Sequence, residues 1–503
     1  MKRKKELIII LSSLLVIVLS VSVAYFTTKI LGTEKDISVT SADLKVIFTS
    51  GSGTINGTNI EPGWTSGENT FTVKNESNGT YKYNIIIKDL VNTFVTEGFL
   101  VYKITSTDGG YNMTDFADVP KSSTSADTVL AENISIDKGA THTYKIEIKY
   151  LESSTINQDE DQGKKLSGKI FIEKAMPTLA SKILEDNPTI GTRSDFSTPF
   201  TTNTVNTLYK ATENGTDVYY FAGKDTESTP INNWIKFGKN SSNQDLYWRI
   251  IRTNSDGGVR LLYHGTSTTS TDAYIGKSAF NTNSNSPKYV GYMYGDTDTT
   301  LEEARTNTND STIKAYIDNW YANNMTSYTK YLSTTAVYCN DREVGSGTYS
   351  ATASLFYYAS RTRLEANKTP TYNCTNIKDA FSGSNSEAKL KYPIALMTAD
   401  EIAYAGGVID TTALMWYYTN SSLESSTGTQ SWRSLSPGSW DGNGAGSWYV
   451  HGSGYPGGLF DSYVVNNSYG VRPAVSLKSC IKYSTGNGTS ETPYEIVETS
   501  SGC

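Results

Sequence analysis

Short runs of alternating apolar and polar residues fill the chain from residue 37 to residue 174, and this pattern most constrains the fold. Residues 81–87 read YKYNIII and residues 143–148 read TYKIEI. Alternation with a period of two places every second side chain on one face of a β-strand. Glycine and asparagine separate the runs, so the region predicts an antiparallel β-sandwich. Its six expected strands are 43–48, 70–73, 81–87, 99–104, 143–148 and 166–172.

The same pattern returns after residue 216 but is joined there by helical periodicity. Residues 255–258 read SDGG between two apolar runs, which is typical of a β-hairpin turn. We therefore expect a mainly β protein with some α structure, in which an antiparallel β-sandwich precedes an α+β domain. The expected strands that open this second domain are 218–221, 233–237, 246–252 and 259–263.

Two helices are predicted from their capping residues. Asp310 or Ser311 can cap a helix whose apolar residues recur on one face of a 3.6-residue repeat. Thr398 and Glu401 have the spacing of a capping box, in which each side chain satisfies a backbone amide at the helix start. We interpret the apolar face of the first helix as core. Its members are Ile313, Ile317, Trp320 and Tyr321.

The length of 503 residues is too great for one hydrophobic core and predicts two or three domains. Met176-Pro177 interrupts the strand pattern, and the following stretch is rich in Thr, Asn, Asp and Pro. We interpret that stretch, which opens with a short helical run at 179–184, as a linker or an extended strap. The expected organisation is a signal peptide or membrane anchor at 1–24, a β-sandwich domain at 36–175, the linker at 176–215 and a C-terminal domain at 216–503.

The N-terminal segment carries the pattern of export. A basic cluster at residues 2–5 precedes the apolar or small residues 7–24, which end in Ser22-Val23-Ala24. This arrangement is typical of a secretory signal peptide. The same 18 residues would span a bilayer if they were retained as an anchor. Both readings place the protein outside the cell or at its surface, with membrane contact only through this segment.

The composition favours a β-rich extracellular protein. The 35 tyrosines raise the aromatic content to 12%, and the net charge is −7. Tyrosine and threonine suit strands. An acidic chain without a basic stripe does not suit nucleic acid, so we exclude that partner.

The cysteines predict two disulfides. No pair has the CxxC spacing of a metal or redox site, and an exported chain favours oxidised cysteines. We expect Cys339 to pair with Cys374 and Cys480 with Cys503, because each pairing closes a loop within one unit. Four unpaired, buried thiols are the alternative. With three histidines in the chain, a His-rich zinc site is not expected.

Four short motifs give the N-terminal domain a family resemblance. They are AYF at 24–26, SADL at 41–44, NIEPG at 59–63 and FTVKN at 71–75. Together they resemble TasA/camelysin-type secreted proteins of Gram-positive bacteria, which are β-sandwich proteins that in several cases build matrix fibres by strand donation. The alternative is a generic bacterial β-sandwich that serves as a spacer. Protease activity proposed within that group finds no support, because the chain has no HExxH motif.

Six motifs in order give the C-terminal domain another resemblance. They are YYFAG, NNWIKFG, LYWRIIR, NDSTIK, TADEIAYAGG and YGVRPAVSL. These resemble an uncharacterised domain of exported Firmicutes proteins and the landmarks of formylglycine-generating-enzyme-like domains, which have a C-type-lectin-like fold. The enzymes of that superfamily use cysteines shortly before the closing motif, and this chain has none between Ser431 and Lys478. Formylglycine-generating activity is therefore not expected.

The stretch from 431 to 477 is the predicted functional region. Trp432 and residues 470–477 are interpreted as fold landmarks, and residues 438–467 as a ligand-binding loop. Aromatic side chains on a rigid scaffold provide contact area at small entropic cost. The alternative is that several of these aromatics form the core, and we expect about half of them to be buried. The predicted contact residues are Trp440, Trp448, His451, Tyr455, Phe460 and Tyr463.

Asp441 and Asn443 raise the question of calcium in this loop. Their oxygen atoms are ligands of the kind that Ca²⁺ prefers, but no EF-hand series follows them. An Asx turn is the alternative use of the same two residues. Calcium is thus a possible cofactor of this loop, and the sequence predicts no other cofactor.

Three functions remain open at this level. The first is a non-enzymatic adhesion or ligand-binding module that recognises a surface glycan or protein. The second is a structural subunit of an extracellular matrix fibre or pilus-like filament, assembled through the N-terminal domain. The third is an enzyme of unrecognised type, for which no Gly-x-Ser-x-Gly elbow or other catalytic motif is found.

Overall fold

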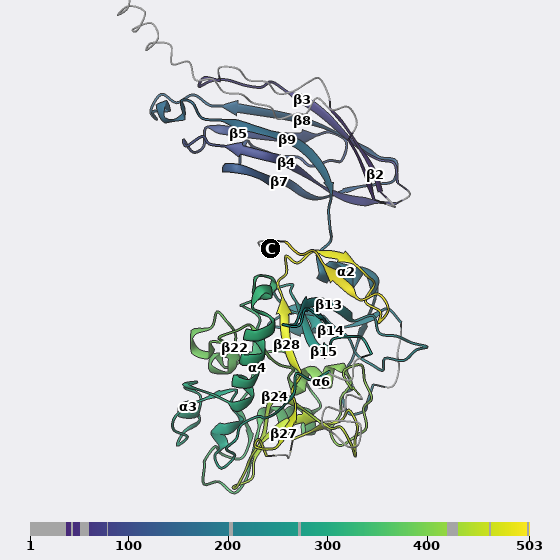
Figure 1. Ribbon diagram of the computed structural model, residues 1–503, viewed down its shortest axis with the longest axis vertical. Helices are drawn as coiled ribbons and strands as arrows, with labels where there is room; N and C mark the ends of the chain where they lie inside the picture. The colour runs from purple at the N-terminus through teal and green to yellow at the C-terminus, as the bar shows by residue number, and fades with distance from the viewer. Residues whose placement is uncertain are drawn as a thin grey trace, which may run out of the picture. The chain divides into compact units, whose positions relative to one another are not determined.

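The protein consists of two compact units, Met1–Met176 and Pro177–Cys503, seen in a computed structural model (Figure 1). The fold is mainly β with some α, as the sequence predicts. The residues that the structure describes are 37–41, 44–50, 60–77, 79–200, 205–269, 273–419, 431–461, 464–499 and 502–503.

The N-terminal unit contains two antiparallel sheets. One has six strands in the order β1-β2-β3-β8-β5-β6, and the other has three in the order β7-β4-β9. The strands are β1 (Ile37–Ser41), β2 (Leu44–Ser50), β3 (Asn69–Asn75), β4 (Tyr81–Asn92), β5 (Leu100–Ser106), β6 (Ala117–Asp118), β7 (Ser122–Ile136), β8 (Thr141–Tyr150) and β9 (Leu166–Lys174).

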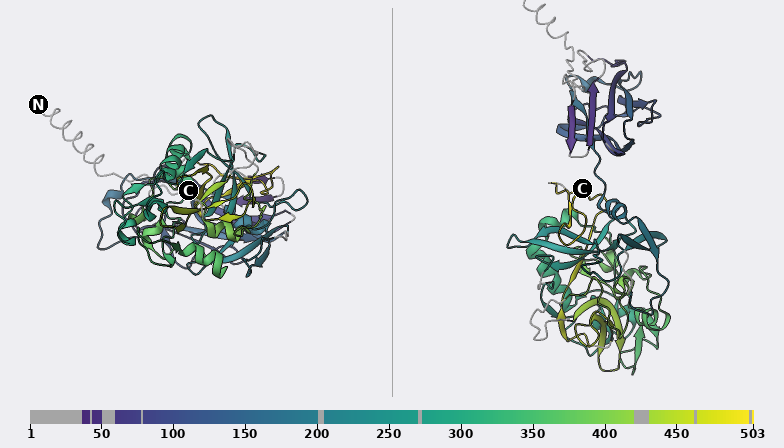
Figure 2. Two further views of the ribbon diagram at one scale, coloured as in Figure 1. Left: turned by 90° about the horizontal axis from the view of Figure 1, so that it is seen from below. Right: turned by 90° about the vertical axis from the view of Figure 1, so that its right-hand side faces the viewer.

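One hydrophobic core joins the two sheets of this unit, whose strands are seen in Figure 2. In β8, alternate residues are buried from His142 to Tyr150, and Phe71 of the neighbouring β3 stacks on Tyr144. All six strands expected from alternation are present. Strand β7 was not predicted, because its first half is rich in Ser and Thr and is mostly exposed, so it carries no apolar period.

The predicted linker at 176–215 is wrong, because the segment is folded onto the C-terminal unit. Helix α2 (Leu179–Asp186) begins at Thr178, whose side chain accepts a hydrogen bond from Ser181 N. Leu179 and Ile183, one turn apart, are buried in the core of that unit. Strand β10 (Thr189–Thr192) then pairs in parallel with β11. In the sequence, the i, i+4 spacing of Leu179 and Ile183 indicated that this short helix packs one face against a core.

A ten-stranded sheet forms the centre of the C-terminal unit. Most neighbours pair antiparallel, and β28 lies between β15 and β23; Figure 1 labels β13, β14, β15 and β28 of this sheet. The predicted hairpin joins β14 to β15. The strands are β10, β11 (Thr207–Glu213), β12 (Thr216–Tyr220), β13 (Trp234–Lys239), β14 (Asp245–Thr253), β15 (Val259–Gly265), β23 (Ile394–Leu396), β28 (Pro473–Leu477), β29 (Tyr483–Thr485) and β30 (Tyr494–Ile496).

A second sheet of seven strands carries the predicted functional loop. Strand β24 contacts β25, β21 and β27, and β26 pairs with β25. The strands are β16 (Lys277–Ala279), β20 (Val344–Ser346), β21 (Phe356–Tyr358), β24 (Trp432–Trp440), β25 (Ala445–Val450), β26 (Leu459–Phe460) and β27 (Ser468–Gly470). Two short ladders pair β17 (Met293–Tyr294) with β18 (Asn309–Asp310), and β19 (Tyr338–Cys339) with β22 (Ala380–Phe381).

Both predicted helix starts are confirmed. Ser311 caps α4 (Thr312–Asn324) by accepting a hydrogen bond from Lys314 N, and the apolar face of α4 is core. Thr398 and Glu401 form a complete capping box at α6 (Ala399–Ala405). The other helical segments are α3 (Leu301–Ala304), α5 (Ala359–Arg361) and a π-helical turn at Thr362–Asn367.

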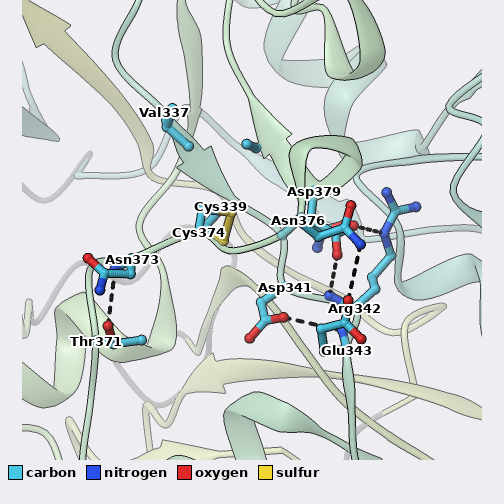
Figure 3. Close-up of a disulfide and its surroundings, with 12 residues drawn as sticks. Val337, Cys339, Asp341, Arg342, Glu343, Thr371, Asn373, Cys374, Asn376 and Asp379 are labelled. Atoms are coloured by element: carbon cyan, nitrogen blue, oxygen red, sulfur yellow. Dashed lines mark hydrogen bonds and ion pairs between the residues drawn. A yellow bond between two sulfur atoms is a disulfide. The ribbon is translucent and has the colours of Figure 1, made fainter. Parts of the chain in front are cut away.

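The two predicted disulfides are confirmed. Cys339 is bonded to Cys374 and Cys480 to Cys503, with Cα–Cα distances of 5.6 and 5.8 Å. Both lie in the C-terminal unit, and Figure 3 shows the first among charged side chains.

The N-terminal export segment lies outside the described residues. Within the described part of the chain, no helix is long and apolar enough to cross a membrane.

Candidate ligand-binding surface

The candidate site is the loop from 451 to 458, which joins β25 to β26. These strands pair antiparallel, with Tyr449 opposite Phe460 and Val450 opposite Leu459. The loop closes on itself through hydrogen bonds from His451 N to Gly458 O (2.9 Å) and from Gly457 N to His451 O (2.8 Å). Both ends of the loop are therefore held together by backbone bonds.

A neighbouring segment holds the loop from outside. Ala413 N donates to Pro456 O (2.9 Å), and the buried Tyr417 hydroxyl donates to Gly457 O (2.7 Å). Gly457 has φ +78°, and a Cβ placed there would lie 2.0 Å from Ala413 O. Only glycine permits both the left-handed backbone and this close approach. The loop is consequently packed as a defined structure rather than as an open tip.

Three aromatic rings gather at the loop, and we call them the aromatic patch: His451, Tyr455 and Phe460. The His451 ring lies edge-to-face with Tyr455, with centroids 6.3 Å apart, and with Phe460, with centroids 5.9 Å apart. Tyr455 is 46% exposed, and the other two rings are half-buried. The rings of the patch are therefore held in place by one another, and part of their surface is accessible to solvent.

A buried ring and a half-buried ring support the patch. Tyr449 is buried and lies 5.7 Å from both His451 and Phe460, measured between ring centroids. Tyr469 stacks on Tyr449 at 5.2 Å. Arg433 lies over the Tyr469 ring at 4.7 Å and joins this stack to β24. The exposed rings thus rest on a layered core.

The charged group of Arg433 donates its hydrogen bonds to acceptors inside the protein. This fully buried guanidinium donates through one nitrogen to Val464 O (2.8 Å) and Asn467 O (2.9 Å). Burial lowers the pKa of Arg433 to about 10, although Tyr469 and Tyr449 oppose the shift. Its role is to hold the chain that returns to β27.

His451 is a neutral hydrogen-bond donor at this surface. Its Nδ1 accepts from Ser453 N (3.1 Å), so in the neutral ring Nε2 carries the hydrogen. Within the described ranges, no side chain or carbonyl accepts a hydrogen bond from Nε2. Burial lowers the pKa of His451, and Asp410 opposes this shift.

The structure corrects two of the predicted contact residues. Trp440 and Trp448 are 2% and 0% exposed. Their indole nitrogens donate to Ala353 O (3.0 Å) and to the Ser360 hydroxyl (2.9 Å). Both rings belong to the core between β24, β25 and the segment around β21, so neither offers a contact surface. Tyr463 lies outside the described residues.

Asp441 and Asn443 form the turn that was the alternative to a calcium site. Asp441 Oδ1 accepts hydrogen bonds from Asn443 N (2.9 Å) and Gly444 N (2.7 Å). This is the geometry of an Asx turn. Over the described ranges, the structure holds no group of three or more His, Cys, Asp or Glu side chains placed to bind a metal.

A buried network of ion pairs was not predicted. Arg252 and Arg260 both donate to Glu401 Oε1, at 3.1 and 2.8 Å, and Arg252 also pairs with Glu213 at 2.8 Å. Burial raises the pKa of Glu213, but Arg252 outweighs this and lowers the value to about 2. The sequence did contain an indication of this network, because Arg252 and Arg260 each lie within an apolar strand run. A charge buried in a strand rarely lacks a partner.

Further ion pairs lie in the same region, and one of their members, Asp341, lies near the Cys339–Cys374 disulfide (Figure 3). Arg363 pairs with Asp400 (2.9 Å) and Asp341 (2.7 Å). Burial raises the pKa of Asp341, although Arg363 opposes the shift. A cavity of about 20 Å³ lies among these groups, which is room for one or two water molecules. The carboxylates around it are engaged by arginines.

Comparisons with known proteins add no family. No protein-family model matches the chain, and no curated protein matches it. Among solved structures, it is similar to a family 123 glycoside hydrolase from Clostridium perfringens, with 10% sequence identity and a TM-score of 0.12. The match covers 37% of this chain and 46% of that protein, so it spans less than half of the hydrolase. A likeness at this level carries no argument about fold or activity.

Proposed function

We propose that the protein is an exported, non-enzymatic binding module of the cell surface, and that its ligand is a glycan. The observation that carries this proposal is the aromatic patch on a loop fixed by Ala413 and Tyr417. The C-type-lectin-like fold expected from sequence is part of the same proposal.

The patch suits recognition because its rings need little ordering on binding. A side chain that is already fixed loses less conformational entropy when a ligand covers it. Aromatic rings also provide large contact area with few rotatable bonds. The C–H groups of a sugar ring stack on such faces, and His451 Nε2 offers a donor for a hydroxyl beside them.

The charged cavity supports a binding role more than an enzymatic one. Its carboxylates accept hydrogen bonds from arginines or backbone amides, so their charge is balanced within the protein. General acid or base catalysis needs a carboxyl group within hydrogen-bond reach of a substrate. The network instead stabilises the contact between α6 and the central sheet.

The proposal is tested by binding of the full-length chain to a glycan panel. We expect Tyr455→Ala to weaken the best glycan at least about tenfold, equivalent to about 1.4 kcal/mol. The matched control is Ile377→Ala, which also removes an exposed apolar side chain, 61% accessible. Unchanged affinity in Tyr455→Ala, or an equal loss in Ile377→Ala, would contradict the proposed surface.

A further inference from the structure

The charges that act on the aromatic patch indicate which glycans it can take. Asp410 is exposed, interacts electrostatically with His451, and donates its backbone N–H to Leu459 O (3.2 Å) beside the patch. A carboxylate at this position repels an anionic ligand, since like charges near a surface interact unfavourably.

Arg433, which packs on Tyr469 in the layer below the patch, cannot offset this repulsion. Arg433 is 0% exposed and lies against Tyr469 in the layer below the patch. Its NH1 donates to Ser447 Oγ (3.1 Å), and its NH2 donates to two backbone carbonyls. Recognition of a carboxylate or sulfate needs guanidinium donors that point toward the ligand. The donors of Arg433 point into the protein.

The ring of His451 is half-buried, and its Nε2 donates to no group within the described residues. Gly454 lies beside the ring, and a Cβ added there would approach His451 Cε1 to 3.2 Å and Nε2 to 3.7 Å. Glycine at 454, with φ +81°, therefore leaves space next to the donor nitrogen. A neutral N–H donor beside apolar rings matches a ligand that carries hydroxyl groups and apolar C–H faces.

We propose that the patch binds an uncharged pyranose, with the sugar face on Tyr455 and Phe460 and a hydroxyl accepting from His451 Nε2. This inference rests on the proposed function and specifies its ligand class. Anionic glycans are rejected by Asp410. Quaternary ammonium compounds are the competing ligand class, because aromatic rings beside a carboxylate also attract cations.

Acid should weaken this binding. Protonation at Nδ1 removes the acceptor of Ser453 N and leaves the ring charged. The titratable groups that contact or act on His451 are Tyr449, Tyr455 and Asp410. Because burial lowers the pKa of His451 below its usual 6.5, binding should be constant from neutral to alkaline pH and should fall only at pH values below the ordinary histidine range.

The test measures the affinity of the full-length chain for a neutral glycan, a carboxylated glycan and choline. The same three affinities are measured for the variants Tyr455→Ala and Asp410→Asn. Asparagine suits position 410 because φ there is +52°. We expect the neutral glycan to bind, to lose at least about tenfold in Tyr455→Ala, and to change little with salt up to about 0.5 M. Asp410→Asn should improve binding of the carboxylated glycan only.

The possible results separate the ligand class, the role of Asp410 and the binding function itself. Tighter binding of choline or of the carboxylated glycan through Tyr455 overturns the ligand class and leaves the binding function standing. Absence of any improvement in Asp410→Asn overturns the role of that carboxylate. If no ligand depends on Tyr455, the proposed function fails together with this inference.

Discussion

Arg472 shows how one buried charge organises the centre of the C-terminal unit. Its guanidinium donates to Tyr263 O (3.1 Å) and Tyr417 O, and it lies over the Trp432 ring. Burial lowers its pKa to about 10, so it stays charged near neutral pH. We predict that Arg472→Met destabilises the unit by about 2–3 kcal/mol in urea unfolding, because carbonyls lose their donors.

The control for this change is Lys236→Met. Lys236 pairs with Glu495 at 2.7 Å, but both side chains are about a third or more exposed. A pair of this kind contributes less than about 1 kcal/mol. An equal decrease in the free energy of unfolding in the two variants would show that the buried hydrogen bonds of Arg472 add no stability beyond that of an exposed ion pair.

His142 makes the N-terminal sandwich sensitive to acid. Tyr111 N donates to the Tyr144 hydroxyl, and the Tyr83 hydroxyl lies 2.5 Å from Tyr144 and 2.8 Å from His142 Nδ1. Buried His142 ends this hydrogen-bonded chain, with its Nδ1 as the partner of the Tyr83 hydroxyl. Burial lowers the pKa of His142, opposed by Asp108 and Asp137.

Stability of this unit should therefore fall with acidity. A histidine with a folded-state pKa below the usual 6.5 favours folding above pH 6.5, and that contribution is lost as pH falls below this value. We expect the denaturation midpoint to decrease between about pH 7.5 and pH 5. His142→Gln keeps an uncharged hydrogen-bond partner for Tyr83 and should flatten this dependence; the same slope in both proteins would contradict it.

At the scale of elements, the loop from 451 to 458 owes its shape to glycine. We predict that Gly457→Ala destabilises the C-terminal unit by more than about 1 kcal/mol, through strain at φ +78° and a clash with Ala413 O. It should also weaken glycan binding. Gly215→Ala is the matched control, since Gly215 has φ +81° and nothing within 4 Å of an added Cβ. Similar losses in thermal unfolding would show that packing against Ala413 is unimportant.

Elements with local determinants were predictable from sequence. The capping box at Thr398 and the alternation of β8 depend on neighbours in the chain, and both are observed. The burial of Trp440 and Trp448 depends on Ala353 and Ser360, about 90 residues away. No pattern among neighbouring residues in the sequence predicts contacts between residues so far apart in the chain. His451, Tyr455 and Phe460 were predicted as contacts, while the role of Asp410 needed the fold.

At the scale of the whole molecule, the two units differ in their covalent constraints. All four cysteines lie in Pro177–Cys503, and the disulfides span 35 and 23 residues. Closing loops of these lengths stabilises a fold by about 3–4 kcal/mol each. We predict that reduction lowers one of two calorimetric transitions and leaves the other unchanged. A shift of both transitions would contradict the separation of the units.

The central claim is that the ligand contacts the aromatic patch, and histidine NMR tests it most directly. The chain has three histidines. His142 and His264 are 5% and 7% exposed, whereas His451 is half-buried at the patch. With ¹⁵N-labelled histidine in the full-length chain, a neutral glycan should shift the His451 imidazole signals and leave the other two unchanged. Saturating glycan that leaves the His451 signals in place would contradict the account.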